Sequence, residues 1–189
     1  GLAAIAALVA EGVNVNVTLL FGVSRYGHVA EAYFQGLEAR LRMGKPIENV
    51  RSVASFFLSR IDATVDRRLG VMGEGPTALR GRAAVSSAKL AYRTFHSLIR
   101  SERWRALAER GGQPQKLLWA STGTKDPTFS DVKYVEELIG PDTITTLPRK
   151  TLDAFRDHGR PSLTLESGLR AAEAALAGLA AAGIDMETV

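Results

Sequence analysis

The sequence contains no cysteine, which excludes disulfide bonds and thiolate chemistry within these 189 residues. It has no apolar run near the roughly 18 residues of a membrane span, and no charged and then apolar leader at its start. A cytoplasmic protein without membrane contacts is therefore expected. The only histidines, His28, His96 and His158, fall in helical patterns without the spacing of metal ligands, so no metal site is expected.

The charge balance is mildly basic and weighted toward arginine. Of 24 basic residues 18 are Arg and 6 are Lys, and the formal net charge is +4. Such an excess suits phosphorylated small molecules or nucleic acid without choosing between them. The arginines of residues 100–110 are interleaved with Glu102 and Glu109, a pattern typical of a solvated helix face. We therefore expect no nucleic acid partner.

Both ends of the sequence lie in helical patterns. The chain begins at Gly1 without an initiator methionine, inside an Ala-rich helical pattern, and Val189 follows shortly after a helix start near Asp185. The hydrophobic content of 46% is enough for one domain with a sizeable core. We interpret residues 1–189 as a single partial domain, a fragment truncated at both ends.

Four apolar runs of strand length alternate with helical patterns. This alternation predicts a parallel sheet with its helices outside, because parallel strands need long crossover connections. The expected fold class is α/β, either part of a (β/α)8 barrel or a small open sheet. The expected strands are residues 13–21, 50–61, 117–122 and 142–147. The expected helices are residues 2–11, 24–43 with Ser24 as N-cap, 62–69, 78–99, 102–109, 130–138, 148–158 and 162–182, with a loop, GVMGEGP, at residues 70–76.

The first expected strand, VNVNVTLLF, alternates apolar residues with amides and a hydroxyl. Because alternate strand residues point to opposite faces, Asn14, Asn16 and Thr18 share one face. Val13, Val15, Val17 and Leu19 are expected on the other face. Asparagine is depleted in strands and costly to bury without partners, so this strand predicts one wall of a polar ligand site. Asn14 is expected to make a structural hydrogen bond at the strand end.

Polar side chains also lie near the carboxyl ends of the other strands, where barrels place their functional groups. In the loop STGTK, small residues let the backbone approach a ligand and Lys125 supplies a point charge, so Lys125 and Arg60 could hold a phosphate from opposite sides. The alternatives are a tight turn whose hydroxyls cap backbone groups, and an ion pair of Arg60 with Asp62 or Asp66. The other candidates are Ser55, Ser59, Ser121, Thr122, Thr124, Thr143, Thr145 and Thr146.

Four ordered segments carry a family resemblance: GVNVNVTLLF, VASFFLSRID, LLWASTGTKDP and IGPDTITTLP. They resemble strands five to eight of bacterial transaldolase, and the resemblance covers nearly the whole chain. It implies a (β/α)8 TIM barrel of which this chain is about half. It also implies a cofactor-free enzyme of the pentose phosphate pathway. Such an enzyme transfers a dihydroxyacetone unit from sedoheptulose 7-phosphate or fructose 6-phosphate to an aldose phosphate through a lysine Schiff base.

The resemblance also implies residue roles. It places Asn16 and Thr18 on the substrate hydroxyls and the catalytic water, Ser55 beside the carbinolamine, and Arg60 and Ser121 on the phosphate. After that serine the family has an aromatic residue and an arginine, which this chain lacks, so Lys125 is inferred as the replacement cation. The family's Schiff-base lysine lies on its fourth strand and is absent from this chain, so isolated residues 1–189 are expected to be inactive.

Two alternative functions accompany this interpretation. A phosphosugar aldolase of the same barrel class would cleave its substrate without an acceptor. A non-catalytic half-barrel would bind phosphosugars only.

Overall fold

The computed structural model describes residues 1–72 and 77–189, so positions 73–76 of the expected loop GVMGEGP lie outside the described residues. Within these ranges the strands are β1 (Val15–Leu20), β2 (Ser52–Phe57), β3 (Lys116–Ala120) and β4 (Thr143–Thr145). The α-helices are α1 (Leu2–Ala10), α2 (Val23–Arg42), α3 (Leu58–Gly70), α4 (Ala83–Ile99), α5 (Glu102–Ala108), α6 (Lys133–Glu136), α7 (Arg149–His158) and α8 (Leu169–Ala181). Short 3-10 turns in the described part of the chain span Thr77–Leu79 and Met186–Thr188.

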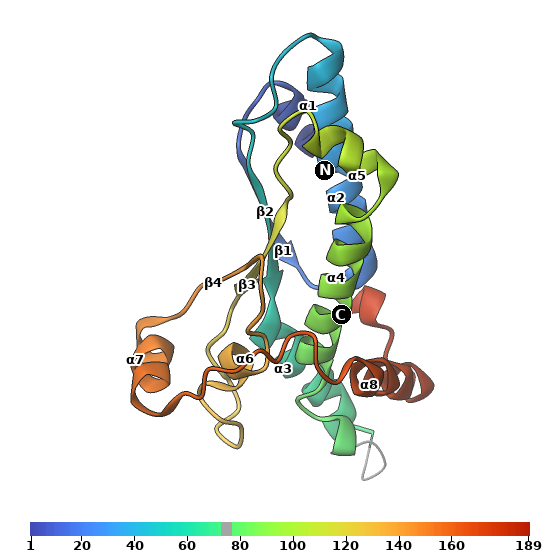
Figure 1. The fold of residues 1–189 in the computed structure, drawn as a ribbon. Helices are drawn as coiled ribbons and strands as arrows, with labels where there is room; N and C mark the ends of the chain where they lie inside the picture. The colour runs from blue at the N-terminus through green and yellow to red at the C-terminus, as the bar shows by residue number, and fades with distance from the viewer. Residues whose placement is uncertain (73–76) are drawn as a thin grey trace.

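The strands form one sheet in the order β1-β2-β3-β4, and every neighbouring pair is parallel. This arrangement confirms the parallel α/β fold predicted from the alternating pattern. Parallel strands end at the same edge of a sheet, so the segments that follow them gather there. Figure 1 shows α3 and α6 at this carboxyl edge, away from α1 and α5.

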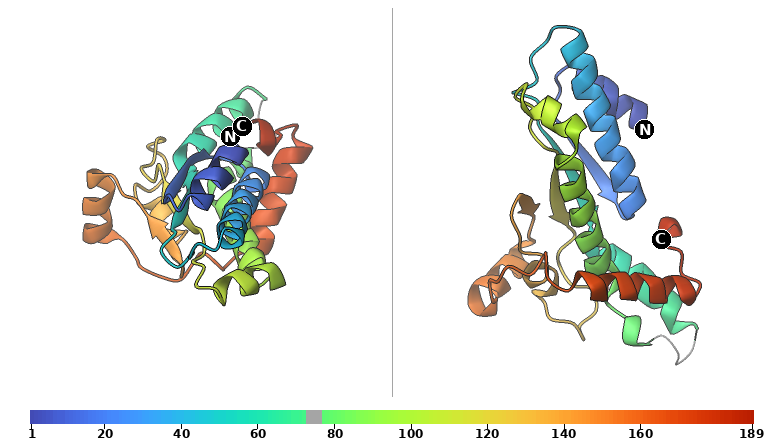
Figure 2. Two further views of the ribbon diagram at one scale, coloured as in Figure 1. Left: turned by 90° about the horizontal axis from the view of Figure 1, so that it is seen from above. Right: turned by 45° about the vertical axis from the view of Figure 1, so that its right-hand side comes forward.

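The helices α1, α2, α4 and α5 lie along one face of the sheet (Figures 1 and 2). The register pairs Ala54 with Leu117 and Phe56 with Trp119, and all four side chains are fully buried on that face. Burying a side chain such as Phe56 or Leu117 stabilises the fold by roughly 1.5–3 kcal/mol. The hydrophobic core therefore lies between the sheet and this helix layer.

The opposite face of the sheet, which we term the open face, keeps accessible side chains. Asn16 pairs with Val53, and Leu118 pairs with Ser55 and Ile144, so these residues share one side. Asn16 is exposed, Val53 and Leu118 are partly buried, and Ile144 remains 39% exposed. The open face thus combines amide, hydroxyl and apolar groups, as a ligand wall would.

The alternation predicted for the first strand fails at its carboxyl end. The register shifts between Val17 and Leu20, and Leu19 adopts a φ of 61°. Leu19 is 52% exposed, whereas Leu20 is 3% exposed and pairs with Phe56 on the helix-covered face. The expectation that Leu19 shares the apolar face was therefore wrong, because this irregularity moves the apolar position by one residue.

The expected strand of residues 50–61 is a strand followed at once by a helix. β2 ends at Phe57 and α3 begins at Leu58, so Ser59 and Arg60 lie in the first helical turn and not in the strand. From this point the buried apolar residues follow helical spacing. They recur at intervals of three and four residues, at Leu58, Ile61, Val65 and Leu69.

Other boundaries also differ from the prediction. α2 begins after Gly22, so Ser24 is not its N-cap, and α6 and β4 are shorter than expected. α4 and α8 begin later than expected, after Gly81 and Gly168, each with a φ of 67°. Glycine tolerates this left-handed conformation, which redirects the chain before each helix. None of the helices within the described ranges is long and apolar enough to cross a membrane.

We predict that Gly36→Ala destabilises the protein. A Cβ at Gly36 on α2 would lie 2.5 Å from the Val9 Cβ and 2.8 Å from the carbonyl oxygen of Ala6, so α1 would have to move away. Overpacking of this kind costs roughly 1–3 kcal/mol of unfolding free energy. Urea unfolding of the complete product of the gene that encodes this chain measures the loss.

Gly27→Ala is the matched control on the same helix, because no atom lies within 4 Å of its added Cβ. Alanine is the better helix former, so this change should raise the unfolding free energy by up to roughly 1 kcal/mol. Changes of the same sign and size in both variants would contradict the proposed close packing of α1 on α2.

Candidate functional site

Asn16 and Ser55 form a hydrogen-bonded pair on the open face. The Ser55 Oγ donates to the Asn16 Oδ1 over 2.7 Å, and Ser55 is only 2% exposed. Because Oδ1 accepts this bond, the Asn16 Nδ2 is the group that can donate to a ligand. Thr18 is exposed on the same strand, one residue before Leu19. β1 and β2 therefore present an oriented amide beside a hydroxyl.

Asn14 has a different role, outside β1. Its Oδ1 accepts a hydrogen bond of 2.7 Å from the backbone N–H of Arg51, which precedes β2. This contact confirms the predicted structural bond at the strand end.

Ser59 and Ser121 join α3 to the end of β3. Their Oγ atoms lie 2.9 Å apart, and the Ser59 N–H donates to the Ser121 carbonyl over 3.0 Å. Ser121 has a φ of 55°, a conformation that costs a non-glycine residue on the order of 1–3 kcal/mol. The two contacts with Ser59 help to hold it there.

Arg60 lies exposed on the first turn of α3, with its Cζ 5.2 Å from the centre of the Phe57 ring. Among the described residues it makes no ion pair. The alternative of a bond to Asp62 or Asp66 was wrong, because Asp62 pairs with Lys133 over 3.1 Å and Asp66 accepts from the Gly81 N–H. Arg60 is thus a cation available to an anionic ligand.

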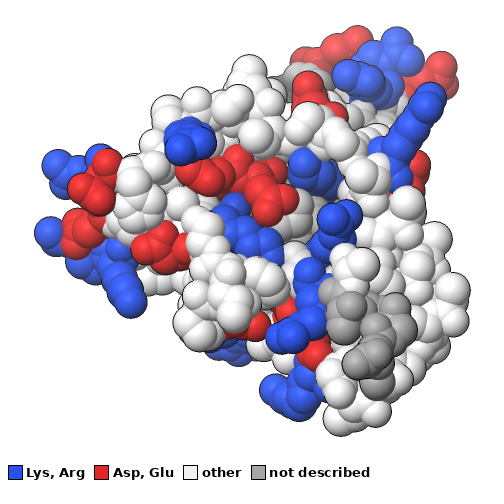
Figure 3. Space-filling model, turned by 90° about the horizontal axis from the view of Figure 1, so that it is seen from below, with Lys and Arg blue, Asp and Glu red and all other residues white. Residues whose placement is uncertain are grey.

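Lys125 lines a cavity of about 430 Å³ between α3 and the loop that follows β3. Arg60 does not line this cavity, so Lys125 and Arg60 do not share it. The cavity wall also includes Ser59, Asp62, Asp66, Arg67, Arg80 and Phe129. Acidic and basic side chains intermingle on this end of the molecule (Figure 3).

Most of the remaining candidate hydroxyls serve the backbone. In STGTK, Thr122 donates to the Thr146 carbonyl over 2.6 Å and Thr124 to the Ser130 carbonyl over 2.8 Å. These bonds match one part of the predicted alternative, in which the hydroxyls cap backbone groups, but the segment is a long loop and not a tight turn. Thr146 and Thr143 likewise donate to the carbonyls of Trp119 and Gly140.

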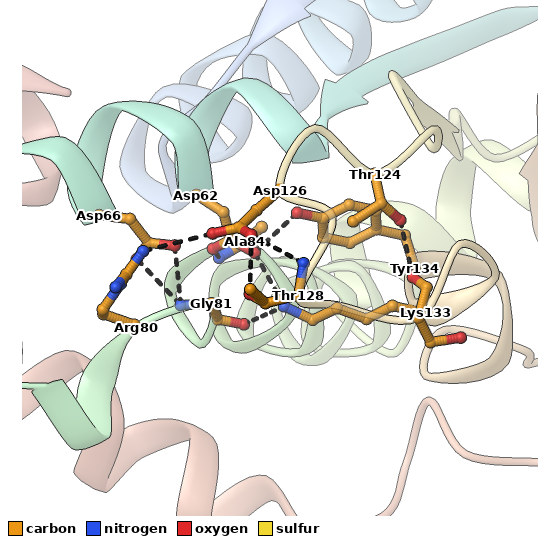
Figure 4. Close-up of polar contacts among 11 residues, drawn as sticks. Asp62, Asp66, Arg80, Gly81, Ala84, Thr124, Asp126, Thr128, Lys133 and Tyr134 are labelled. Atoms are coloured by element: carbon orange, nitrogen blue, oxygen red, sulfur yellow. Dashed lines mark hydrogen bonds and ion pairs between the residues drawn. The ribbon is translucent and has the colours of Figure 1, made fainter.

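The sequence-based prediction missed a buried polar cluster of Asp62, Lys133 and Tyr134. Asp62 is 2% exposed, and its carboxylate accepts hydrogen bonds from Lys133, Tyr134 and the Ala84 N–H (Figure 4). Burial, together with the neighbouring Asp62 charge, raises the pKa of Tyr134 well above its usual value. The sequence did offer one signal of this cluster. Asp62 is an acidic residue directly after buried Ile61 in the helical pattern.

Burial also raises the pKa of Asp66, against the opposing effect of the hydrogen bond from the Gly81 N–H. The described residues contain no group of three or more His, Asp or Glu side chains able to hold a metal ion.

Comparison with known proteins identifies the family. A sequence model named transaldolase/fructose-6-phosphate aldolase matches residues 1–189. The chain is 48% identical over 191 residues to a transaldolase of Saccharopolyspora erythraea, an alignment that covers 100% of this chain and 52% of the relative. It is also 48% identical over 191 residues to a transaldolase of Parafrankia sp., with the same coverage.

A transaldolase of Acidothermus cellulolyticus is 46% identical over 190 residues, with 100% of this chain and 51% of the relative aligned. The chain thus spans about half the length of the curated relatives that it matches. Both the family match and the relatives cover all of its strands and helices. The chain belongs to the transaldolase/fructose-6-phosphate aldolase family.

Proposed function

We propose that this chain forms part of a transaldolase, in which its four strands make up half of a (β/α)8 barrel and one partial domain. The observation that carries the proposal is the Asn16–Ser55 pair on the open face, in a family member whose relatives are named transaldolases. In a complete barrel the open face would become the interior, and the carboxyl edge would border the active site. β1 to β4 correspond to the fifth to eighth strands in this proposal.

Asn16, Thr18 and Ser55 then face the reacting carbons of a sugar phosphate. The iminium of the Schiff base is the electron sink, and its formation and breakdown need an acid-base relay whose partners are held at fixed positions. The Asn16 Nδ2 would donate to a substrate hydroxyl while the Ser55 hydroxyl donates to the Asn16 Oδ1. Thr18 would lie beside the catalytic water.

Arg60, Ser121 and Lys125 are proposed to bind the substrate phosphate. Arg60 carries a charge that no described acidic group neutralises, and Ser121 lies at the adjoining strand end. Lys125 belongs to the same loop as Ser121, and it lines the cavity. Binding energy from the phosphate would orient the reacting carbons at the other end of the substrate.

The Schiff-base lysine is proposed to lie outside residues 1–189. Lys125 is exposed to solvent, and Lys133 is held by Asp62 and the Gly81 carbonyl. Burial lowers the pKa of Lys89, but its Nζ donates to the carbonyls of Thr164 and Ser167, away from the strands. Residues 1–189 alone would then be inactive.

The proposed enzyme is cytoplasmic, needs no cofactor and serves the pentose phosphate pathway. The second candidate is simple aldol cleavage, because the matching family is named for both transaldolase and fructose-6-phosphate aldolase. The two reactions differ in whether an acceptor is needed.

Reduction with borohydride in the presence of fructose 6-phosphate tests the proposal. The complete gene product should gain a covalent three-carbon adduct on one lysine, and peptide mass mapping should place it outside residues 1–189. Adduct formation should release one triose phosphate per site, and any further release should depend on an added aldose phosphate. Steady release without an acceptor would favour the aldolase, and an adduct on Lys125 or Lys133 would overturn the proposed position of the Schiff base.

We predict that Ser55→Ala lowers kcat about tenfold and changes KM much less, because an unheld Asn16 amide loses its orientation in the transition state. Steady-state kinetics of the complete gene product with fructose 6-phosphate and an aldose phosphate measure both constants.

Ser52→Ala is the matched control on the same strand. Ser52 is also buried, but its Oγ donates to the Val15 carbonyl at the amino end of β2. This variant should keep kcat. An equal loss of kcat in both variants would show a general effect of removing a buried hydroxyl and contradict the role of Ser55.

A further inference from the structure

We propose that Asp62, Lys133 and Tyr134 form a positioning unit. This unit holds the proposed phosphate-binding residues Arg60 and Lys125 at a fixed distance from each other. The proposal rests on the proposed function, and it assigns these three residues no contact with substrate. They act through two segments, the first turn of α3 with Arg60 and the loop of residues 121–132 with Lys125.

The Asp62 carboxylate is fully satisfied in a buried position. Its Oδ2 accepts from the Tyr134 hydroxyl over 2.8 Å and from the Lys133 Nζ over 3.1 Å, and its Oδ1 accepts from the Ala84 N–H over 2.8 Å. The side chains of Asp62 and Lys133 are 3% and 11% exposed. Figure 4 shows the lysine and tyrosine converging on this one carboxylate.

These contacts tie the loop of residues 121–132 to α3 at both of its ends. At its start, Ser121 contacts Ser59 through backbone and hydroxyl bonds. Directly after its end, Lys133 and Tyr134 bind Asp62. Ser59 and Asp62 are three residues apart on one face of α3, because a helix turns once in 3.6 residues. Arg60 lies between them in sequence and is exposed.

A structural requirement at Gly81 supports the unit. The Lys133 Nζ also donates to the Gly81 carbonyl, and a Cβ at Gly81 would lie 2.8 Å from that Nζ and 2.5 Å from the Phe129 ring. The residue therefore leaves room for the lysine. Its N–H binds Asp66, so the turn before α4 is fixed from both sides.

Stability alone is a weak reason for a buried ion pair. The cost of removing two charges from water can exceed their attraction, and apolar replacements of similar volume are often as stable. Such a pair does fix geometry, because its partners satisfy each other only in one arrangement. Here that arrangement sets the distance between Arg60 on α3 and Lys125 in the loop.

Tyr134→Phe tests the unit with the least disturbance, because it removes only the hydroxyl that donates to Asp62. In the complete gene product we expect KM for fructose 6-phosphate to rise about fivefold while kcat stays within about twofold. The matched control is Tyr33→Phe. Tyr33 is also buried, and its hydroxyl donates to the Gln113 carbonyl, which precedes β3 at the opposite edge of the sheet. Tyr33→Phe should leave KM unchanged.

Lys133→Met provides a second variant should Tyr134→Phe fail to fold, with Lys116→Met as its control. Lys116 makes an exposed ion pair of 4.0 Å with Asp142, at the amino end of β3. Lys133→Met should raise KM and Lys116→Met should not. Equal KM values for the site variants and their controls would overturn the proposal, as would a fall in kcat at unchanged KM.

Inorganic phosphate separates this proposal from the proposed function. Added phosphate should raise the Tm of the wild-type protein, and Tyr134→Phe should raise the half-saturating phosphate concentration about fivefold while Tyr33→Phe does not. This result would support the positioning unit even if no aldol transfer were found. A wild-type Tm that phosphate does not raise, or equal effects in both variants, would overturn it.

Discussion

Parallel pairing of the four strands is the constraint on which the rest of this structure depends. It requires long crossovers, which place α2 and α4 over one face of the sheet. It also brings every carboxyl end to one edge, where Ser59, next to Arg60 on α3, contacts Ser121 at the end of β3. The open face and this edge together hold the groups that we assign to substrate.

Two directly joined elements determine what lies at that edge. Because α3 begins immediately after β2, its first turn carries Arg60 at the sheet end, with no intervening loop to displace it. The loop after β3 is longer and is anchored to that same helix at its start and after its end. The short connection carries Arg60 and the doubly anchored long one carries Lys125, so both cations follow strand ends at the same edge of the sheet.

The sequence predicted those features that depend on period and order. The four strands, their parallel pairing and the structural bond of Asn14 followed from alternation and spacing. The change from strand to helix at Leu58 was missed because the apolar residues of the run 50–61 fit the spacing of a strand as well as that of a helix. The irregularity near Leu19 was missed because it depends on pairing with β2. The partners of Asp62 come from residues more than 20 positions away, and contacts at such separations have no local signature.

The central claim is that the substrate phosphate binds at the carboxyl edge of the sheet, between Arg60 and Lys125, and not beside Arg67 in the cavity that Lys125 also lines. Its most direct test is the KM for fructose 6-phosphate of Arg60→Met and Arg67→Met in the complete gene product. Both arginines are exposed on α3, but only Arg67 lines the cavity. Arg60→Met should raise KM by at least about tenfold, since a charge-assisted bond is lost, and Arg67→Met should leave KM nearly unchanged. The opposite ranking would contradict this account and place the phosphate in the cavity.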